Sequence, residues 1–170
     1  MRRLILFRHA KTAPRAPGQR DINRALTDRG IADSQAMATR LARDGLVPDL
    51  VLISPAVRTR QTWDHAKAAF PEANSEVVNA IYEAEIEDIA AIVSAHAART
   101  DTLMVIGHNP GLQDYAVDRA AEGGDAAHHV DQLEARFPTA AAAAFLIDEN
   151  GRASFDGLFT PKDYLLGDPI

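Results

Sequence analysis

The sequence contains no cysteine, a single tryptophan and no long hydrophobic run. Without cysteine, the chain cannot form disulfides, use a thiolate nucleophile, hold an iron–sulfur cluster or build a cysteine-ligated zinc site. No apolar run approaches the roughly 20 residues that a membrane-spanning helix needs. The apolar residues 4–7 are followed at once by Arg8 and His9, so the run is far too short for the hydrophobic region of a signal peptide. We therefore expect a cytoplasmic protein with no membrane partner.

Basic residues are not in excess either. The 170-residue chain has 18 lysines and arginines against 24 aspartates and glutamates, which gives a formal net charge of −6. A net negative charge supplies no overall field that would attract nucleic acid, so we expect no nucleic-acid partner, and any anion site must come from a local cluster of cations. The length and the ordinary globular composition predict a single domain spanning residues 1–170.

Apolar runs bounded by turn residues recur along the chain, most of them between helical patterns. This alternation is typical of a parallel sheet that helices cover on both faces. We therefore predict the α/β class, with a three-layer α/β/α sandwich around a mostly parallel central sheet. The predicted strands cover residues 4–7, 50–53, 77–78, 103–106 and 142–147, and the last of them continues into a terminal hairpin with residues 152–159.

Helix signals fall between these runs. Thr27 is a good N-cap and Gly45 follows the last turn of the first helix. Asn109 and Pro110 combine a capping residue with a proline at the first helical position, which predicts the start of another helix. The first helix is predicted over about residues 28–44, further helices over about residues 56–70, 86–98 and 130–137, and loops over residues 11–24 and 122–129.

Three of the predicted strands end in charged or polar residues that a sheet does not need. In an open α/β sheet, ligands bind at the carboxyl edge of the strands, where these residues would meet. Two guanidinium groups and two imidazoles at that edge would form a cationic pocket that suits a phosphoryl group. The residues are Arg8 and His9 after the first strand, Ser54 and Arg58 after the second, and His108 after the fourth.

Each of these residues alone has a simpler explanation. Arg8 and His9 could be a solvated strand end, Arg58 a surface residue of a helix, and His108 a loop histidine bonded to a carbonyl group. Their shared position favours the functional interpretation, because independent surface residues have no reason to gather at one edge of a sheet.

Four motifs in order carry a resemblance to a known family. The sequence resembles the histidine phosphatase superfamily, specifically its small SixA-like branch of phosphohistidine phosphatases, over nearly the whole chain. The more usual first motif of the superfamily has glycine after Arg-His, and Ala10 departs from it in the manner of the SixA-like branch. The motifs are Leu6-Phe7-Arg8-His9-Ala10-Lys11, Leu26-Thr27-Asp28-Arg29-Gly30, Ser54-Pro55-Ala56-Val57-Arg58-Thr59-Arg60-Gln61-Thr62 and Gly107-His108-Asn109-Pro110-Gly111.

The resemblance implies roles for the four strand-end residues. His9 would be the nucleophile, and would form a phosphohistidine intermediate that water then hydrolyses. Arg8, Arg58 and His108 would hold the phosphoryl oxygens, where fixed cations stabilise the charge of the transition state. Neighbouring cations also disfavour protonation of His9, which keeps a ring nitrogen free to attack near neutral pH. No metal and no other cofactor is implied.

The resemblance also points to a general acid. The superfamily takes it from a carboxylate before its third-region helix, and Glu83 lies in the matching neighbourhood. In the alternative interpretation, Glu83, Glu85 and Glu87 merely favour the positive start of the following helix. Because a phosphohistidine substrate leaves as an imidazole, it needs less protonation, and the enzyme can work without a dedicated acid.

The leading functional prediction is a metal-independent phosphatase for phosphohistidine in a protein. The runner-up is a phosphatase or mutase for small phosphate esters, and a non-catalytic phosphate-binding module is the alternative from another class. The expected partner is a phosphohistidine-bearing protein or a small phosphorylated substrate. Only residues 11–24 and 122–129 are long enough to rim the pocket, so we expect an open site, with closure of residues 11–24 over it as the alternative.

Overall fold

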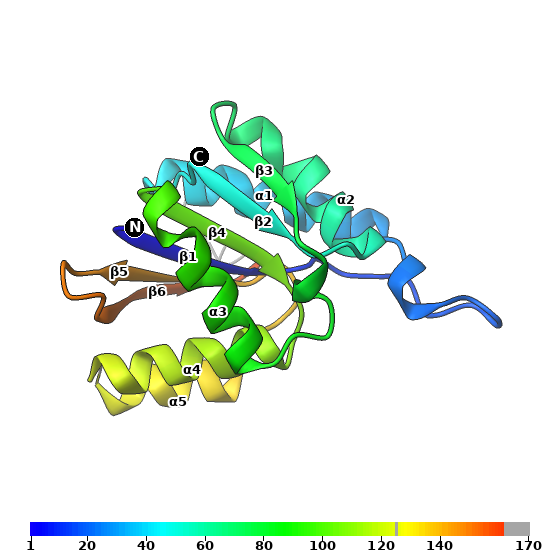
Figure 1. Cartoon of the computed structure of the whole chain (residues 1–170). Helices are drawn as coiled ribbons and strands as arrows, with labels where there is room; N and C mark the ends of the chain where they lie inside the picture. The colour runs from blue at the N-terminus through cyan, green and yellow to red at the C-terminus, as the bar shows by residue number, and fades with distance from the viewer. Residues whose placement is uncertain (125, 162–170) are drawn as a thin grey trace.

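The computed structural model describes residues 1–124 and 126–161, in which a six-stranded sheet is covered by helices on both faces (Figure 1). The strand order is β3-β2-β4-β1-β5-β6. Strands β1 to β4 run parallel, whereas β5 is antiparallel to β1 and β6 is antiparallel to β5. The predicted α/β/α architecture with a mostly parallel sheet and a terminal hairpin is confirmed. The strands are β1 (Arg3–Arg8), β2 (Leu50–Ile53), β3 (Asn74–Val77), β4 (Thr102–Gly107), β5 (Ala142–Ile147) and β6 (Ala153–Phe159).

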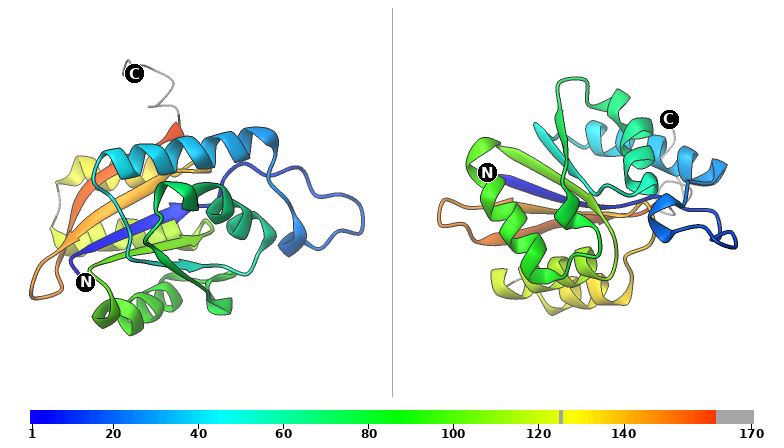
Figure 2. Two further views of the ribbon diagram at one scale, coloured as in Figure 1. Left: turned by 90° about the horizontal axis from the view of Figure 1, so that it is seen from above. Right: turned by 45° about the vertical axis from the view of Figure 1, so that its right-hand side comes forward.

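Two helices cover one face of the sheet and three cover the other (Figures 1 and 2). The first face carries α1 (Asp28–Arg43) and α2 (Val57–Ala66), and the second carries α3 (Ile86–His96), α4 (Gly111–Gly123) and α5 (Ala127–Ala135). None of these helices in the described ranges is both long enough and apolar enough to cross a bilayer. Four short 3-10 helices are η1 (Asp21–Asn23), η2 (Lys67–Ala69), η3 (Asn79–Ile81) and η4 (Ala97–Arg99).

Strand β1 lies in the middle of the sheet and divides the core into two halves. Its side chains alternate, so that Leu4 and Leu6 pack with α3, α4 and α5, while Ile5 and Phe7 pack with α1 and α2. All four are at most 1% exposed. Burial on both faces explains why this strand is a continuous apolar run. The residues that follow the run therefore lie at the carboxyl edge of the sheet.

The start of α1 holds the chain that leaves β1. The Thr27 hydroxyl oxygen accepts a hydrogen bond from the Gly30 backbone N–H at 3.1 Å, as its predicted N-cap role requires. The Thr27 backbone N–H donates to the Lys11 carbonyl at 2.9 Å. A Cβ atom at position 30 would lie only 2.1 Å from that carbonyl oxygen, so Gly30 permits a close approach that no other residue allows. Lys11 is therefore fixed against the helix.

Strand β3 differs from its prediction. The strand covers Asn74–Val77 rather than residues 77–78, and it lies at the edge of the sheet, where Val77 is 54% exposed. The side chains of this edge strand are mostly exposed, so it has no apolar run that could be found in the sequence.

The predicted loop over residues 122–129 is wrong. Helix α4 continues to Gly123 and α5 already begins at Ala127, so the predicted helix start near residue 130 is late by three residues. Position 125, between the two helices, lies outside the described residues. His128 and His129, which the sequence places in a polar loop, lie instead on α5.

The start of α4 also differs from its prediction. The helix begins at Gly111, and Pro110 precedes it after a cis peptide bond with Asn109. The Asn109 amide does not cap the helix, but donates to the Gln113 side chain at 2.8 Å and to the Phe137 carbonyl at 3.2 Å. The predicted helices over residues 56–70 and 86–98 end in the 3-10 turns η2 and η4.

Candidate active site

His9 is the first residue beyond β1 and is anchored on both sides. Its backbone N–H donates to the Gly107 carbonyl at 3.1 Å, and its own carbonyl accepts from Ala140 N–H at 3.1 Å. The ring nitrogen Nδ1 lies 2.8 Å from the Ala10 carbonyl oxygen. Because a carbonyl oxygen can only accept, Nδ1 carries the hydrogen, and in the neutral ring Nε2 then carries the lone pair. His9 is thus set in the tautomer whose Nε2 can attack.

The surroundings of His9 also keep its ring neutral. Burial is the largest effect, and together with the charges of Arg58, Arg8 and Arg24 it lowers the pKa of His9 to about 4, against the opposing hydrogen bond to Ala10. The sequence prediction had the right direction but named only the cations. At neutral pH, the His9 ring is therefore uncharged although it lies in a cationic environment.

His108 follows β4 and faces His9, with ring centroids 5.2 Å apart. Arg58 Nε donates to His108 Nδ1 at 3.3 Å, so Nδ1 is an acceptor and the hydrogen of the neutral ring is on Nε2. Nε2 lies 2.7 Å from the Ser54 hydroxyl oxygen and donates to it. Burial, followed by the charge of Arg58, lowers the pKa of His108 to about 3. His108 is therefore neutral as well, in the tautomer opposite to that of His9.

Arg8 is the last residue of β1 and is held against the segment before β5. Its Nη1 donates to the Phe137 carbonyl at 2.6 Å, the same carbonyl that receives the Asn109 amide. Its Nε atom is buried and has no hydrogen-bond partner among the described residues. Burial lowers the pKa of Arg8 from its ordinary value, but an arginine remains charged. A fixed cation with an unpaired donor is suited to an oxyanion.

Arg58, in the first turn of α2, is fixed by a residue that the sequence analysis missed. Its side chain is 8% exposed, and its Nη2 lies 3.0 Å from Asp21 Oδ2 while its Nη1 donates to the Asp21 carbonyl at 2.9 Å. The Thr62 hydroxyl, one turn later on α2, donates to the Arg58 carbonyl at 2.7 Å and accepts from Ala10 N–H at 3.0 Å. The helix start and the His9 segment are thereby bonded to each other.

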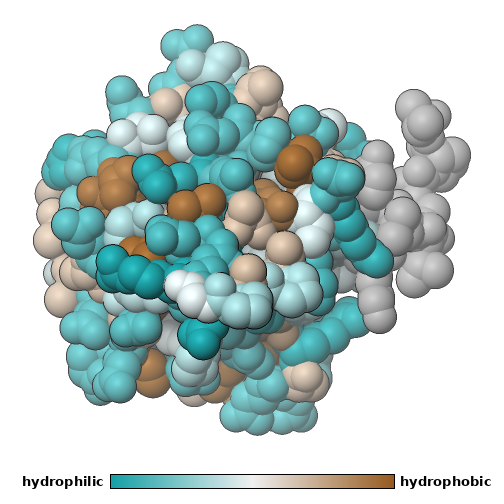
Figure 3. Space-filling view, turned by 90° about the vertical axis from the view of Figure 1, so that its right-hand side faces the viewer, coloured by the Kyte–Doolittle hydropathy of each residue, from teal (hydrophilic) through white to brown (hydrophobic). Residues whose placement is uncertain are grey.

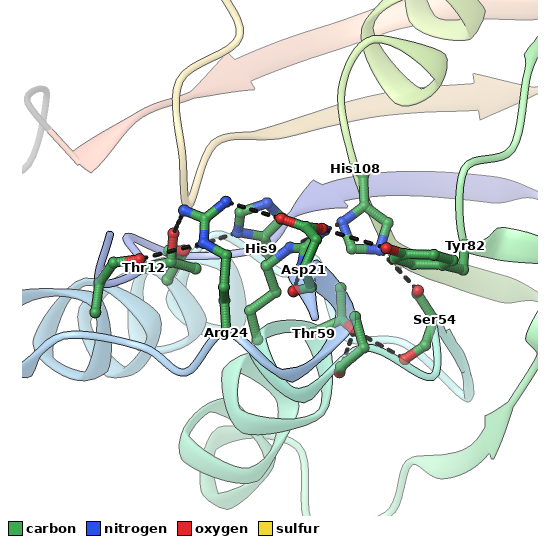
Figure 4. Close-up of polar contacts among 12 residues, drawn as sticks. His9, Thr12, Asp21, Arg24, Ser54, Thr59, Tyr82 and His108 are labelled. Carbon is green, nitrogen blue, oxygen red and sulfur yellow. Dashed lines mark hydrogen bonds and ion pairs between the residues drawn. The ribbon is translucent and has the colours of Figure 1, made fainter. Parts of the chain in front are cut away.

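Asp21, in η1, lies between Arg24 and Tyr82 (Figure 4). Its Oδ1 accepts from Arg24 Nη1 at 3.1 Å, and its Oδ2 accepts from the Tyr82 hydroxyl at 3.3 Å in addition to Arg58. Burial raises the pKa of Asp21, but the hydrogen bonds from Arg24 and Arg58 and the charge of Arg58 outweigh it and hold that pKa below its ordinary value. The Asp21 carboxylate therefore stays ionised and joins the loop over residues 11–24 to the site.

These groups surround a cavity of about 580 Å³, which we call the active-site cavity. It opens at the carboxyl edge of the parallel strands, on a face that is largely hydrophilic (Figure 3). No aspartate or glutamate belongs to its described lining, although Asp21 pairs with Arg24 and Arg58 from outside it. The charged and titratable residues that line it are Arg8, His9, Lys11, Arg24, Arg58 and His108.

The structure brings four of the five predicted site residues together and leaves Glu83 apart. Arg8, His9, Arg58 and His108 line the active-site cavity, whereas Glu83 does not. Glu83 is exposed and has a left-handed backbone, with φ 58°, in the turn between η3 and α3. The general-acid role of Glu83 stays a prediction to which the geometry lends no support.

The described residues of the segment 122–129 do not line the cavity either. Thr139, just before β5, contributes to the wall instead. Across residues 1–124 and 126–161, no group of three or more histidine, aspartate and glutamate side chains is arranged to hold a metal ion.

Comparison with known sequences gives the family. Residues 4–104 match the model of the histidine phosphatase superfamily (branch 1). An uncharacterised chloroplast protein of Arabidopsis thaliana is 34% identical over 125 residues, covering 68% of this chain and 57% of the relative, so the chain spans little more than half of that relative's length. An uncharacterised protein of Picosynechococcus is 31% identical over 134 residues, covering 78% of this chain and 80% of the relative.

Solved structures agree in fold. A candidate phosphohistidine phosphatase SixA from Agrobacterium tumefaciens matches with a TM-score of 0.82 at 30% identity, covering 94% of this chain and 98% of the other. The protein histidine phosphatase SixA complexed with tungstate shares the fold, with a TM-score of 0.78 at 23% identity over 95% of this chain and 99% of the other. The fold is the one that these solved phosphatases share. The chain belongs to the histidine phosphatase superfamily.

Proposed function

We propose that the protein is a metal-independent phosphatase that removes the phosphoryl group from phosphohistidine in another protein, with His9 as the nucleophile. The observation that carries the proposal is the state of His9. Its ring is neutral and has its lone pair on Nε2, and His9 lines the active-site cavity together with several cations. Binding alone needs the cations but no free nucleophile, so this feature argues against a non-catalytic phosphate-binding module.

The reaction has two displacements at phosphorus. In the first, His9 Nε2 forms a bond to phosphorus while the phosphorus–nitrogen bond of the substrate breaks, and the substrate imidazole leaves with the electron pair and gains a proton from solvent. In the second, a water oxygen bonds to phosphorus, the bond to His9 breaks, and inorganic phosphate leaves while the water gives up a proton. His9 ends with its lone pair restored.

The cations around His9 stabilise both displacements. The transferred phosphoryl group carries its charge on three equatorial oxygens, and fixed donors aimed at them lower the barrier without reorganisation. Arg8 offers its unpaired Nε–H, and Arg58 is already oriented by Asp21 and His108. These two guanidinium groups are the main oxyanion ligands in the proposal.

The choice of phosphohistidine over an ester is supported by the lining of the cavity. An ester leaves as a poor oxyanion and needs a general acid, but no carboxylate lines the described cavity and Glu83 lies outside it. An imidazole leaves with less help. The likeness to the Agrobacterium candidate phosphohistidine phosphatase is consistent with this substrate class. A cytoplasmic location belongs to the same proposal.

The test is a parallel assay with a phosphohistidine protein and a generic aryl phosphate, each with and without a chelator. We expect fast release of phosphate from phosphohistidine, slow release from the aryl ester, and no effect of the chelator. Faster turnover of the ester would support the small-molecule phosphatase instead, and a lack of turnover with both would support a binding module. Loss of activity on chelation, restored by a metal ion, would contradict the metal-independent mechanism.

A further inference from the structure

A second cavity of about 400 Å³, which we call the side cavity, adjoins the active-site cavity. The two share Lys11 and Thr139 in their walls. The side cavity extends from this shared wall along the start of α1, where Arg29 and Asp33 line it. A substrate with its phosphoryl group at His9 can therefore reach the side cavity with a neighbouring group.

Lys11 stands at the boundary between the two cavities and is held there by its backbone. Its carbonyl oxygen accepts from Thr27 N–H and lies in the space that the missing side chain of Gly30 leaves open. The Lys11 side chain is exposed, and no described residue forms an ion pair or hydrogen bond with its ammonium group. A fixed backbone thus presents an unpaired cation to both cavities.

The side cavity has a positive charge balance in an acidic protein. The exposed cations Lys11 and Arg29 line it, against one carboxylate, Asp33, among the described lining residues. Arg29 is only loosely paired, because its Nε lies 3.5 Å from Asp33 Oδ2 and its side chain is 66% exposed. With a net charge of −6 over the whole chain, a positive cavity beside the site is a local feature that attracts an anion.

We propose that the side cavity binds a carboxylate side chain next to the phosphohistidine of a protein substrate, an inference that rests on the proposed function. The active-site cavity has no carboxylate in its described lining and suits a multiply charged phosphoryl group, whereas Asp33 offsets part of the charge in the side cavity and favours a single negative charge. Pro138 and Pro161 add apolar walls to the side cavity. The site thus selects for aspartate or glutamate beside the target histidine.

The test compares two synthetic phosphohistidine peptides that differ only in their flanking residues, glutamate in one and glutamine in the other. For the wild-type protein, we expect kcat/KM to be about fivefold higher for the glutamate peptide, mainly through a lower KM, as one exposed ion pair allows. The preference should shrink in high salt, because the pairs are exposed.

Substitutions locate the preference. Arg29→Gln and Lys11→Gln should each bring the ratio of the two kcat/KM values close to one. Arg60→Gln is the matched control, because it removes the same charge from an exposed position of α2 that lines neither cavity, and it should leave the ratio unchanged. Thermal unfolding of each variant identifies any loss of the fold.

Equal kcat/KM values of the wild-type protein for the two peptides would overturn the proposal that the side cavity binds a carboxylate, and would leave the proposed phosphohistidine phosphatase function in place. A preference that survives both Arg29→Gln and Lys11→Gln, or that Arg60→Gln removes equally, would overturn it too, since the general charge of the protein would then be responsible. No turnover of either peptide would overturn the proposed function and this inference with it.

Discussion

The two site histidines are neutral in opposite tautomers, and each tautomer has a structural cause. His9 Nδ1–H donates a hydrogen bond to the Ala10 carbonyl. His108 accepts a hydrogen bond at Nδ1 from Arg58 and donates one from Nε2 to Ser54. In the proposed mechanism, His9 can therefore attack phosphorus in this tautomer. The hydrogen of His108 Nε2 is taken by Ser54, so we expect His108 to gain a proton at Nδ1, with release of the Arg58 hydrogen bond, when an anion binds.

The first prediction concerns His9. His9→Ala should lower kcat/KM by a factor on the order of 10³ or more, because no other group can replace the nucleophile. Folding should persist, with a cost of about 1 kcal/mol for the lost Ala10 hydrogen bond. Rapid-quench trapping on the wild type should find the phosphoryl group on His9, and exposed His128 serves as control through His128→Ala. Phosphate trapped on another residue would contradict the mechanism.

The second prediction concerns the proton on His108. Its pKa of about 3 means that it is neutral near pH 7, and a bound dianion raises that pKa through a favourable charge interaction. Binding of tungstate, a dianion near neutral pH, should therefore take up protons, with the uptake falling as pH rises. Calorimetry in buffers of different ionisation enthalpy measures the uptake. His108→Gln should abolish it, and equal uptake by that variant would assign the proton elsewhere.

The third prediction concerns Asp21, which orients Arg58 through both its carboxylate and its carbonyl. Asp21→Asn keeps the backbone contact and removes the charge, so we expect kcat to fall at least about tenfold, as for a lost charged hydrogen bond. Asp21→Glu should recover part of the loss. Asp64→Asn on α2, which breaks only an exposed pair with Lys67, is the control. A change confined to thermal stability would show that Asp21 has no part in catalysis.

At the scale of elements, the strands that build the site could be predicted because they are buried. β1, β2 and β4 lie inside the sheet, and each is a continuous apolar run whose end marks the site. β3 is polar and lies at the edge, so its position could not be read from an apolar run. The prediction of a loop over residues 122–129 was wrong because an alanine-rich, glycine-containing segment can end one helix and start another as readily as form a loop.

The contact between Asp21 and Arg58 could not be predicted from sequence patterns. Asp21 reaches Arg58 across 37 positions only because the loop over residues 11–24 folds back to the site. No periodicity links a loop carboxylate to a helix arginine. The position of Thr62 could have been predicted more easily, since it lies four positions after Arg58 and therefore on the same side of α2.

The fourth prediction tests the contact between Gly30 and Lys11. Gly30→Ala would put a methyl group 2.1 Å from a backbone oxygen, so one of the two segments must move. We expect the free energy of unfolding to fall by about 2–3 kcal/mol, as for an overpacked contact. Activity should fall with it, because Lys11 is two residues from His9. Gln35→Ala at an exposed position of α1 should change stability by about 0.5 kcal/mol or less.

At the scale of the molecule, the loop over residues 11–24 projects away from the body (Figures 1 and 2). Its base is held at several points: Thr12 pairs with Leu26, Ala13 N–H donates to the Ala25 carbonyl at 3.1 Å, and Asp21 bonds to Arg58. A lid needs a free hinge, and such a base leaves only the tip free to move. We therefore expect the loop to form a fixed rim on one side of the open site.

The fifth prediction separates this rim from a closing lid. Replacing residues 15–18 by two glycines removes the tip but keeps Pro14, Asp21 and Arg24, which line or hold the active-site cavity. Because a fixed rim excludes no water, turnover of a small aryl phosphate should stay within about twofold of the wild type, whereas a lid that completes the site would make it fall by an order of magnitude or more. Turnover of a phosphohistidine protein should fall several-fold through KM, since the rim is a surface that a folded substrate meets. Equal losses for the small and the large substrate would contradict the rim and favour closure over the site.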